Sequence, residues 1–164
     1  YGDTTFNAEN DETDKRKVSF PQANVMEKVI SLMENLYHNP MTKQQIAELM
    51  NFDERQSDYY YNAGCYLELF QKAENNDREL TRLGERVFKM NYKERQLHIV
   101  SLILKHKIFA DFFDSIINTG SLPNKKEIEE RMIALNICNN CDTLSRRANS
   151  VLGWLKWIFN LTNI

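Results

Sequence analysis

Apolar residues recur along much of this chain at steps of three and four, the spacing that places side chains on one face of an α-helix. The pattern predicts helices over residues 25–38, 42–50, 53–70, 81–88, 92–118, 124–135 and 143–161. The region 92–118 is expected to be two helices, broken near 106–108. Two short extended pieces, 71–74 and 78–80, flank a turn-forming tripeptide at 75–77 and predict a β-hairpin. The pattern therefore indicates a mainly α-helical protein.

The helix predicted over 53–70 has two different faces. Its core-facing side is expected to carry Tyr60, Ala63, Leu67 and Phe70. The other side carries Gln56, Tyr59 and Asn62. Capping boxes at Asp53-Gln56 and Thr42-Gln45 predict where this helix and the preceding one begin. Two helices joined by so short a turn suggest a helix-turn-helix, and a hairpin directly after the second helix is what a winged helix needs.

The last predicted helix repeats this pattern. Shifted by 88 positions, the chain places Ser145 under Ser57 and continues the match through the pairs Trp154 with Tyr66, Leu155 with Leu67, and Ile158 with Phe70. We therefore interpret residues 1–20 as a polar arm or linker and 21–90 as a winged helix-turn-helix. Residues 91–164 form a helical, helix-turn-helix-like second unit that resembles a diverged repeat.

Charge narrows the functional classes. A formal net charge of −2 on 164 residues provides no global positive field that would attract nucleic acid. Any DNA contact must therefore rest on local charge. Between residues 143 and 164 the only charged side chains are Arg146, Arg147 and Lys156, whereas residues 1–20 carry five acids against three bases.

The cysteines and the hydropathy favour the cytoplasm. Cys65, Cys138 and Cys141 are too few, and odd in number, for a secreted disulfide framework, which favours a reducing compartment. No apolar run reaches the ~18 to 20 residues that span a bilayer, so we expect no membrane partner. The lone Cys138-x-x-Cys141 pair lacks the further ligands of a structural zinc site, and we expect no metal and no cofactor.

Several stretches together carry a resemblance to a known family. They are the Pro21-Gln22 start before the first helix, the block TKQQIAELMNFDERQSDYYYNAGCYLELF, LTRLGERV after the hairpin, and SRRANSVLGWLKWI near the end. Residues 21–164 resemble the winged-helix accessory modules that accompany type II restriction endonucleases and related defence proteins in bacteria and archaea. The resemblance implies a module that binds double-stranded DNA for a nuclease domain in the same or a neighbouring chain.

The first set of candidate DNA contacts follows from docking the helix at 53–70 in a major groove, with its N-terminal half leading. Gln56 and Asn62 would pair with adenine edges, and Ser57 or Tyr59 would meet base or phosphate. Further phosphate contacts would come from Lys43, Gln44, Arg78 and Arg82. The opposing interpretation is that the tyrosines pack between helices and that Asp53, Glu54 and Asp58 repel phosphate.

A second set lies on the last helix, where Arg146, Arg147, Asn149 and Ser150 are expected on the outer side. An arginine there can form a forked contact with phosphate or guanine. The alternative is a solvated pair, or salt bridges to Glu129 and Glu130.

Catalysis is not expected in this chain. The common metal-dependent restriction core needs a lysine two positions after an acidic residue, and no lysine here has that neighbour. The leading competitor to DNA binding is a protein-interaction or dimerisation module without direct DNA contact, in which the chain forms a homodimer or holds the nuclease domain.

Overall fold

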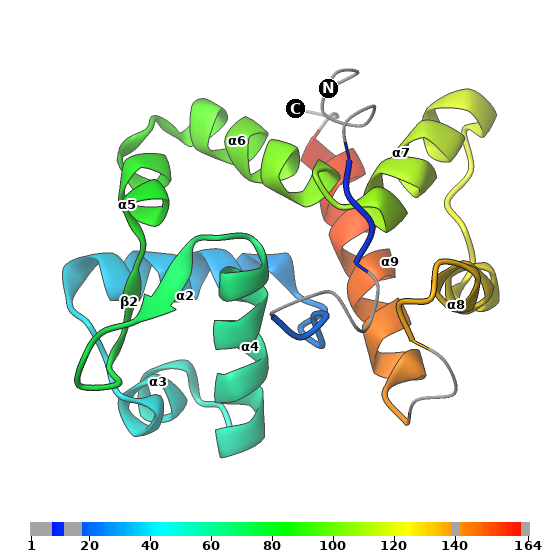
Figure 1. The fold of residues 1–164 in the computed structure, drawn as a ribbon. Helices are drawn as coiled ribbons and strands as arrows, with labels where there is room; N and C mark the ends of the chain where they lie inside the picture. The colour runs from blue at the N-terminus through cyan, green and yellow to red at the C-terminus, as the bar shows by residue number, and fades with distance from the viewer. Residues whose placement is uncertain (1–7, 12–17, 139–141, 162–164) are drawn as a thin grey trace.

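The computed structural model describes residues 8–11, 18–138 and 142–161, and these form a mainly helical protein (Figure 1). In chain order the elements are α2 (Met26–His38), α3 (Lys43–Met50), α4 (Glu54–Tyr66), β1 (Phe70–Lys72), β2 (Arg78–Leu80), α5 (Arg82–Lys89), α6 (Tyr92–Leu104), α7 (Lys107–Thr119), α8 (Lys125–Ala134) and α9 (Leu144–Leu161). The sequence prediction of a mainly α-helical fold is thus confirmed.

Helix starts follow the capping residues seen in the sequence. Thr42 and Asp53 each accept from the backbone N–H three residues on, and the glutamine there bonds back to the cap. Asn124 and Glu127 form the same reciprocal pair at the start of α8. Each box satisfies two amide donors that would otherwise have no partner in the first turn.

The last four residues of the predicted 53–70 helix are not helical. α4 ends at Tyr66, and Glu68 takes a left-handed backbone conformation with φ 64°. The chain then reverses so that Phe70 pairs with Leu80 in the antiparallel β1–β2 hairpin. Gly64 makes this reversal possible, because a Cβ there would lie only 1.9 Å from the Phe70 ring.

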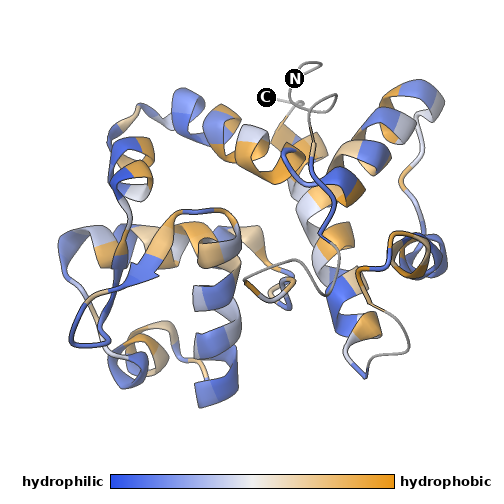
Figure 2. Ribbon diagram, viewed as in Figure 1, coloured by the Kyte–Doolittle hydropathy of each residue, from blue (hydrophilic) through white to orange (hydrophobic). Residues whose placement is uncertain are grey.

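Aromatic residues from both halves of the chain form one shared core. The Phe109 ring stacks on Phe20 with centroids 6.2 Å apart and on Trp154 at 5.4 Å, and Tyr66 meets Phe20 edge-on at 5.5 Å. Trp154 also donates its indole N–H to the Ala23 carbonyl over 2.7 Å. Figure 2 shows apolar residues gathered where α6, α7 and α9 meet. The two halves therefore pack as one body.

Residues 8–11, which were expected to belong to a polar arm, are docked on this body. Glu9 forms a parallel bridge with His106, at the break between α6 and α7 that the sequence predicted. Phe20, at the other end of the predicted arm, is 1% exposed in the aromatic core.

Two leucines of the helices α3 and α6 lie at the surface. Leu49 is 55% exposed and Leu97 is 45% exposed. Across the part of the chain that the structure describes, no helix combines the length and the apolar character needed to cross a membrane.

Candidate nucleic-acid interface

The first turns of α4 and α9 point to the same side of the molecule (Figure 1). Tyr59 and Arg146 are a pair of side chains that joins α4 and α9 on this side. Arg146 on α9 donates from Nη1 to the hydroxyl oxygen of Tyr59 on α4 over 3.3 Å, and its guanidinium lies 5.8 Å from the centre of the Tyr59 ring. Two residues predicted separately as DNA contacts are therefore neighbours. We call this surface, built around Tyr59 and Arg146, the α4–α9 face.

The other α4 candidates differ in how accessible their side chains are to DNA. Gln56 is exposed, but its side-chain oxygen accepts from the Asp53 N–H as part of the capping box. A two-bond pairing with adenine would have to share or break that bond. Asn62 is half-buried. Ser57 is 1% exposed, so its prediction as a DNA contact is wrong: its side chain points into the core.

Tyr60 and Tyr61 show that the packing alternative is correct for part of the aromatic run. They are 4% and 6% exposed, and burial raises the pKa of both hydroxyls. Tyr59 stays half-buried at the surface. Of the three consecutive tyrosines, only Tyr59 is placed to meet a ligand on the α4–α9 face.

Asp58 forms ion pairs with two of the cations that were predicted to contact phosphate. Lys43 lies 2.7 Å from its carboxylate, and this hydrogen bond raises the pKa of Lys43. Arg78 lies 3.8 Å from the same carboxylate, donates to the Asn76 carbonyl and covers the Tyr61 ring at 5.3 Å. With its side chain only 13% exposed, Arg78 links the hairpin to α4 and is poorly placed for phosphate.

Gln44 and Arg82 are both exposed. Gln44 lies in the first turn of α3, beside the Lys43–Asp58 pair. Arg82 opens α5, a helix that packs on α2, α6 and β2 and has no substantial contact with α4 or α9. Arg82 is therefore separated from the α4–α9 face.

The α9 candidates also divide by burial. Arg146 is exposed, and no ion pair joins it to Glu129 or Glu130 among the described residues. Arg147 and Asn149 are half-buried, with Nε of Arg147 fully enclosed. Ser150 is 0% exposed and its hydroxyl donates to the Arg146 carbonyl, so the prediction that it lies on the outer side of the helix is wrong.

Lys125 belongs to this surface but was not singled out from the sequence. Its ammonium group donates to the Ser145 hydroxyl, next to Arg146. Lys125 follows the cap of α8 as Lys43 follows the cap of α3. An alignment of the repeat that started from the two capping boxes would have found it. Lys43 is neutralised by Asp58, whereas Lys125 bonds a neutral hydroxyl, so the α8–α9 side keeps more positive charge.

No group of three or more metal-binding side chains occurs within the residues that the structure describes. Cys138 is disulfide-bonded, a feature that the sequence analysis did not predict, and Cys141 of the same motif lies outside the described residues. Cys65 is a free thiol, and burial raises its pKa.

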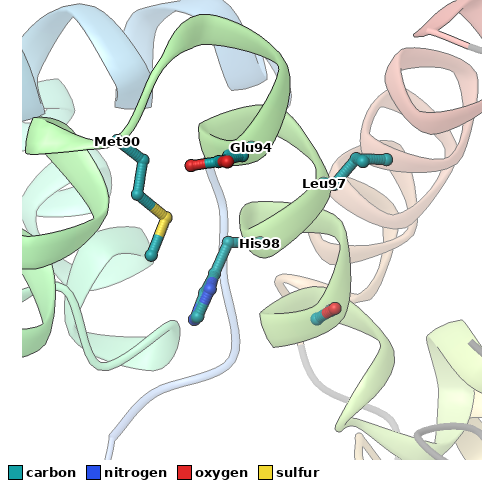
Figure 3. A pocket seen from close by; sticks show the side chains of 5 residues that line it. Met90, Glu94, Leu97 and His98 are labelled. Carbon is teal, nitrogen blue, oxygen red and sulfur yellow. The ribbon is translucent and has the colours of Figure 1, made fainter.

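A second surface feature is an open groove of about 590 Å³ on α5 and α6, lined by Met90, Glu94, Leu97, His98 and Ser101. Figure 3 shows the side chains of Met90, Glu94 and His98 gathered on one side of α6. Burial, with smaller contributions from Arg86 and Lys105, lowers the pKa of His98. The groove has no contribution from the α4–α9 face.

Fold and surface together define a mainly α-helical protein in which α4 and α9 meet through Tyr59 and Arg146. A family model described as a domain of unknown function (DUF7226) matches residues 28–163, and the chain belongs to that family. No curated protein matches the chain, and no solved structure does.

Proposed function

We propose that this chain is a double-stranded DNA-binding module that uses the α4–α9 face and has no catalysis of its own. Its partner would be the nuclease domain of a type II restriction endonuclease, in the same or a neighbouring chain, and its location the cytoplasm. The nuclease association rests on the sequence resemblance alone. DNA binding also has support from the arrangement of the helices.

The order of elements supports a winged helix-turn-helix at residues 21–90. α3 and α4 are joined by a short turn, and the β1–β2 hairpin follows α4 directly. Met41, just before α3, pairs with Arg78 of β2 in both directions, over 3.0 and 2.7 Å. This extra bridge ties the hairpin to the start of α3, which would hold a wing beside a recognition helix.

The contact between Arg146 and Tyr59 is the observation that carries the proposal. Among the described residues the exposed Arg146 side chain bonds a neutral phenol and pairs with no carboxylate, so it keeps its full charge and several donors for an incoming phosphate or guanine. The tyrosine ring holds the guanidinium in position before a ligand arrives. Ordering this side chain in advance lowers the entropy cost of binding.

The test is the affinity of the whole chain for a labelled duplex of ~20 base pairs, measured by fluorescence anisotropy at two salt concentrations. Arg146→Ala should weaken binding by roughly 5- to 150-fold, the equivalent of about 1–3 kcal/mol for one specific arginine contact. The dependence on salt should also become less steep by about one released ion.

Lys156→Ala is the matched control. It removes one positive charge from an exposed position on the same helix, ten residues beyond Arg146. It should leave the affinity within about twofold of the wild type, because surface charge far from a contact is screened. If both variants lost the same DNA affinity, the loss would reflect net charge and not a specific contact of Arg146. No binding by the wild type at low salt would reject the proposal.

The second candidate is a protein-interaction or dimerisation module. The open groove at Met90, Leu97 and His98 favours it, as does the pairing of Lys43 and Arg78 with Asp58, which removes two cations from the α4 side. Concentration-dependent dimerisation in sedimentation velocity, together with no DNA binding, would support this candidate.

A further inference from the structure

Residues 8–11 are held by backbone hydrogen bonds at the junction of α6 and α7. The Glu9 N–H donates to the Lys105 carbonyl over 2.8 Å, and the Lys107 N–H donates to the Glu9 carbonyl over 2.7 Å. Lys107 is the first residue of α7, so no carbonyl within that helix can accept its N–H. The segment therefore satisfies backbone groups that the helix break leaves open.

Asp11 adds a second set of bonds. Its carboxylate accepts from the Tyr66 hydroxyl at the end of α4 and from Nδ1 of His106, whose distances to the two oxygens are 2.9 and 3.0 Å. A carboxylate only accepts, so the imidazole tautomer is the one with its proton on Nδ1. The Asp11 side chain is 12% exposed and that of His106 is 18% exposed. Both donors are thus satisfied by one largely enclosed carboxylate.

These bonds lie over the core that joins the two halves of the molecule. The Tyr66 ring stacks on His106 at 3.8 Å and lies 6.0 Å from the Trp154 ring. On the other side, the Asn10 side chain donates to the Leu135 carbonyl at the end of α8 over 2.9 Å. Three consecutive residues, 9–11, therefore contact α4, the α6–α7 junction and the end of α8.

We infer that Tyr66, His106 and the α6–α7 junction form an acceptor site for the chain's own residues 8–11, with Asp11 as the group that is recognised. The bound segment acts as a strap across the two halves of the molecule. The site takes a short extended peptide by two backbone bonds and one carboxylate. This inference stands on contacts outside the α4–α9 face and does not depend on DNA binding.

Glu9 provides the contrast that makes the inference testable. It lies two residues before Asp11 and carries the same charge, but its side chain is exposed, and its backbone makes the two hydrogen bonds to the α6–α7 junction. A site that recognises a carboxylate at position 11 should tolerate loss of the one at position 9. General electrostatic attraction to the segment would not distinguish them.

The test is residue-resolved amide hydrogen exchange on the full chain. In Asp11→Ala, the Lys107 amide should exchange at least ~10-fold faster than in the wild type, since hydrogen bonds to charged groups are the strong ones. In Glu9→Ala it should keep its wild-type rate. The Ala110 amide, which bonds the His106 carbonyl over 3.0 Å without using the strap, serves as the internal reference and should not change.

Equal Lys107 exchange rates in Asp11→Ala, Glu9→Ala and the wild type would overturn the inference, as would parallel acceleration of Lys107 in both variants. If Asp11→Ala lowers stability so far that all amides exchange through global unfolding, Asp11→Asn replaces it. That variant keeps the side-chain volume and loses the charge. Its Lys107 amide should still be accelerated selectively over Ala110, and the absence of that selectivity would again overturn the inference.

Discussion

Tyr59 and Arg146 are 87 positions apart and meet through a hydrogen bond and a cation–π contact. Neither interaction is strong by itself at a surface, where a cation over an aromatic ring contributes about 0.5–1 kcal/mol. Their importance lies in position. The pair brings an uncompensated charge from α9 beside the half-buried outer face of α4, where Gln56 and Asn62 also lie.

Ser57 provides the opposite case. Its hydroxyl is enclosed, and it has no hydrogen-bond partner within the described residues. A buried polar atom without a partner costs about 1–3 kcal/mol. We therefore expect Ser57→Ala to raise the free energy of unfolding by up to ~1 kcal/mol in urea denaturation, after allowing for the small lost volume.

The Ser57→Ala variant also distinguishes a DNA contact by Ser57 from its burial in the core. DNA affinity of Ser57→Ala should equal that of the wild type, because the side chain cannot reach the surface. A loss of both stability and affinity would show that the hydroxyl is used, in conflict with the packing described here.

The α3–α4 and α8–α9 segments share the geometry of their turns. α3 is followed by Asn51 with φ 55°, and α8 is followed, after Leu135, by Asn136 with φ 58°. In each case the next residue is buried and bonds back to the helix: Phe52 to the Ala47 carbonyl over 2.9 Å, and Ile137 to the Met132 carbonyl over 2.9 Å. Asparagine tolerates the left-handed conformation better than most residues. The similar turns support the repeat proposed from the sequence.

This turn geometry predicts the effect of replacing Asn51. Asn51→Gly should be close to neutral, whereas Asn51→Ala should lower the free energy of unfolding by about 1 kcal/mol, because a Cβ disfavours positive φ. Thermal or urea denaturation of the pair measures the difference. Indistinguishable stabilities would mean that the turn relaxes to another conformation.

The starts of the helices were easier to predict from the sequence than the end of α4. Starts at Thr42, Asp53, Thr81 and Asn124 follow from capping chemistry, which is local in sequence. The end of α4 was missed because helical spacing continues through Phe70, while the reversed chain packs the Phe70 ring against Gly64. A contact of that kind depends on tertiary packing and leaves no periodic signal.

At the scale of the whole molecule, contacts between distant segments are the part of the structure that the sequence does not predict. The sequence predicts the mainly helical fold, the hairpin strand at Arg78–Leu80 and the two helices that carry the α4–α9 face. The pairing of Asp58 with Lys43 and Arg78 and the docking of residues 8–11 are not predictable in this way, because these contacts join segments distant in sequence. Net charge also does not locate the proposed DNA-binding surface, since that surface depends on which cations lack an acidic partner.

The most direct measurement of the central claim is an NMR titration of the isotope-labelled chain with a duplex of ~20 base pairs, at low and at moderate salt. The account predicts that the amide shifts concentrate at residues 55–62, at Lys125 and at residues 144–149, and that they fade as salt rises. Shifts confined to the groove at Met90 to Ser101, or no shifts at low salt, would contradict the α4–α9 face as a DNA-binding surface.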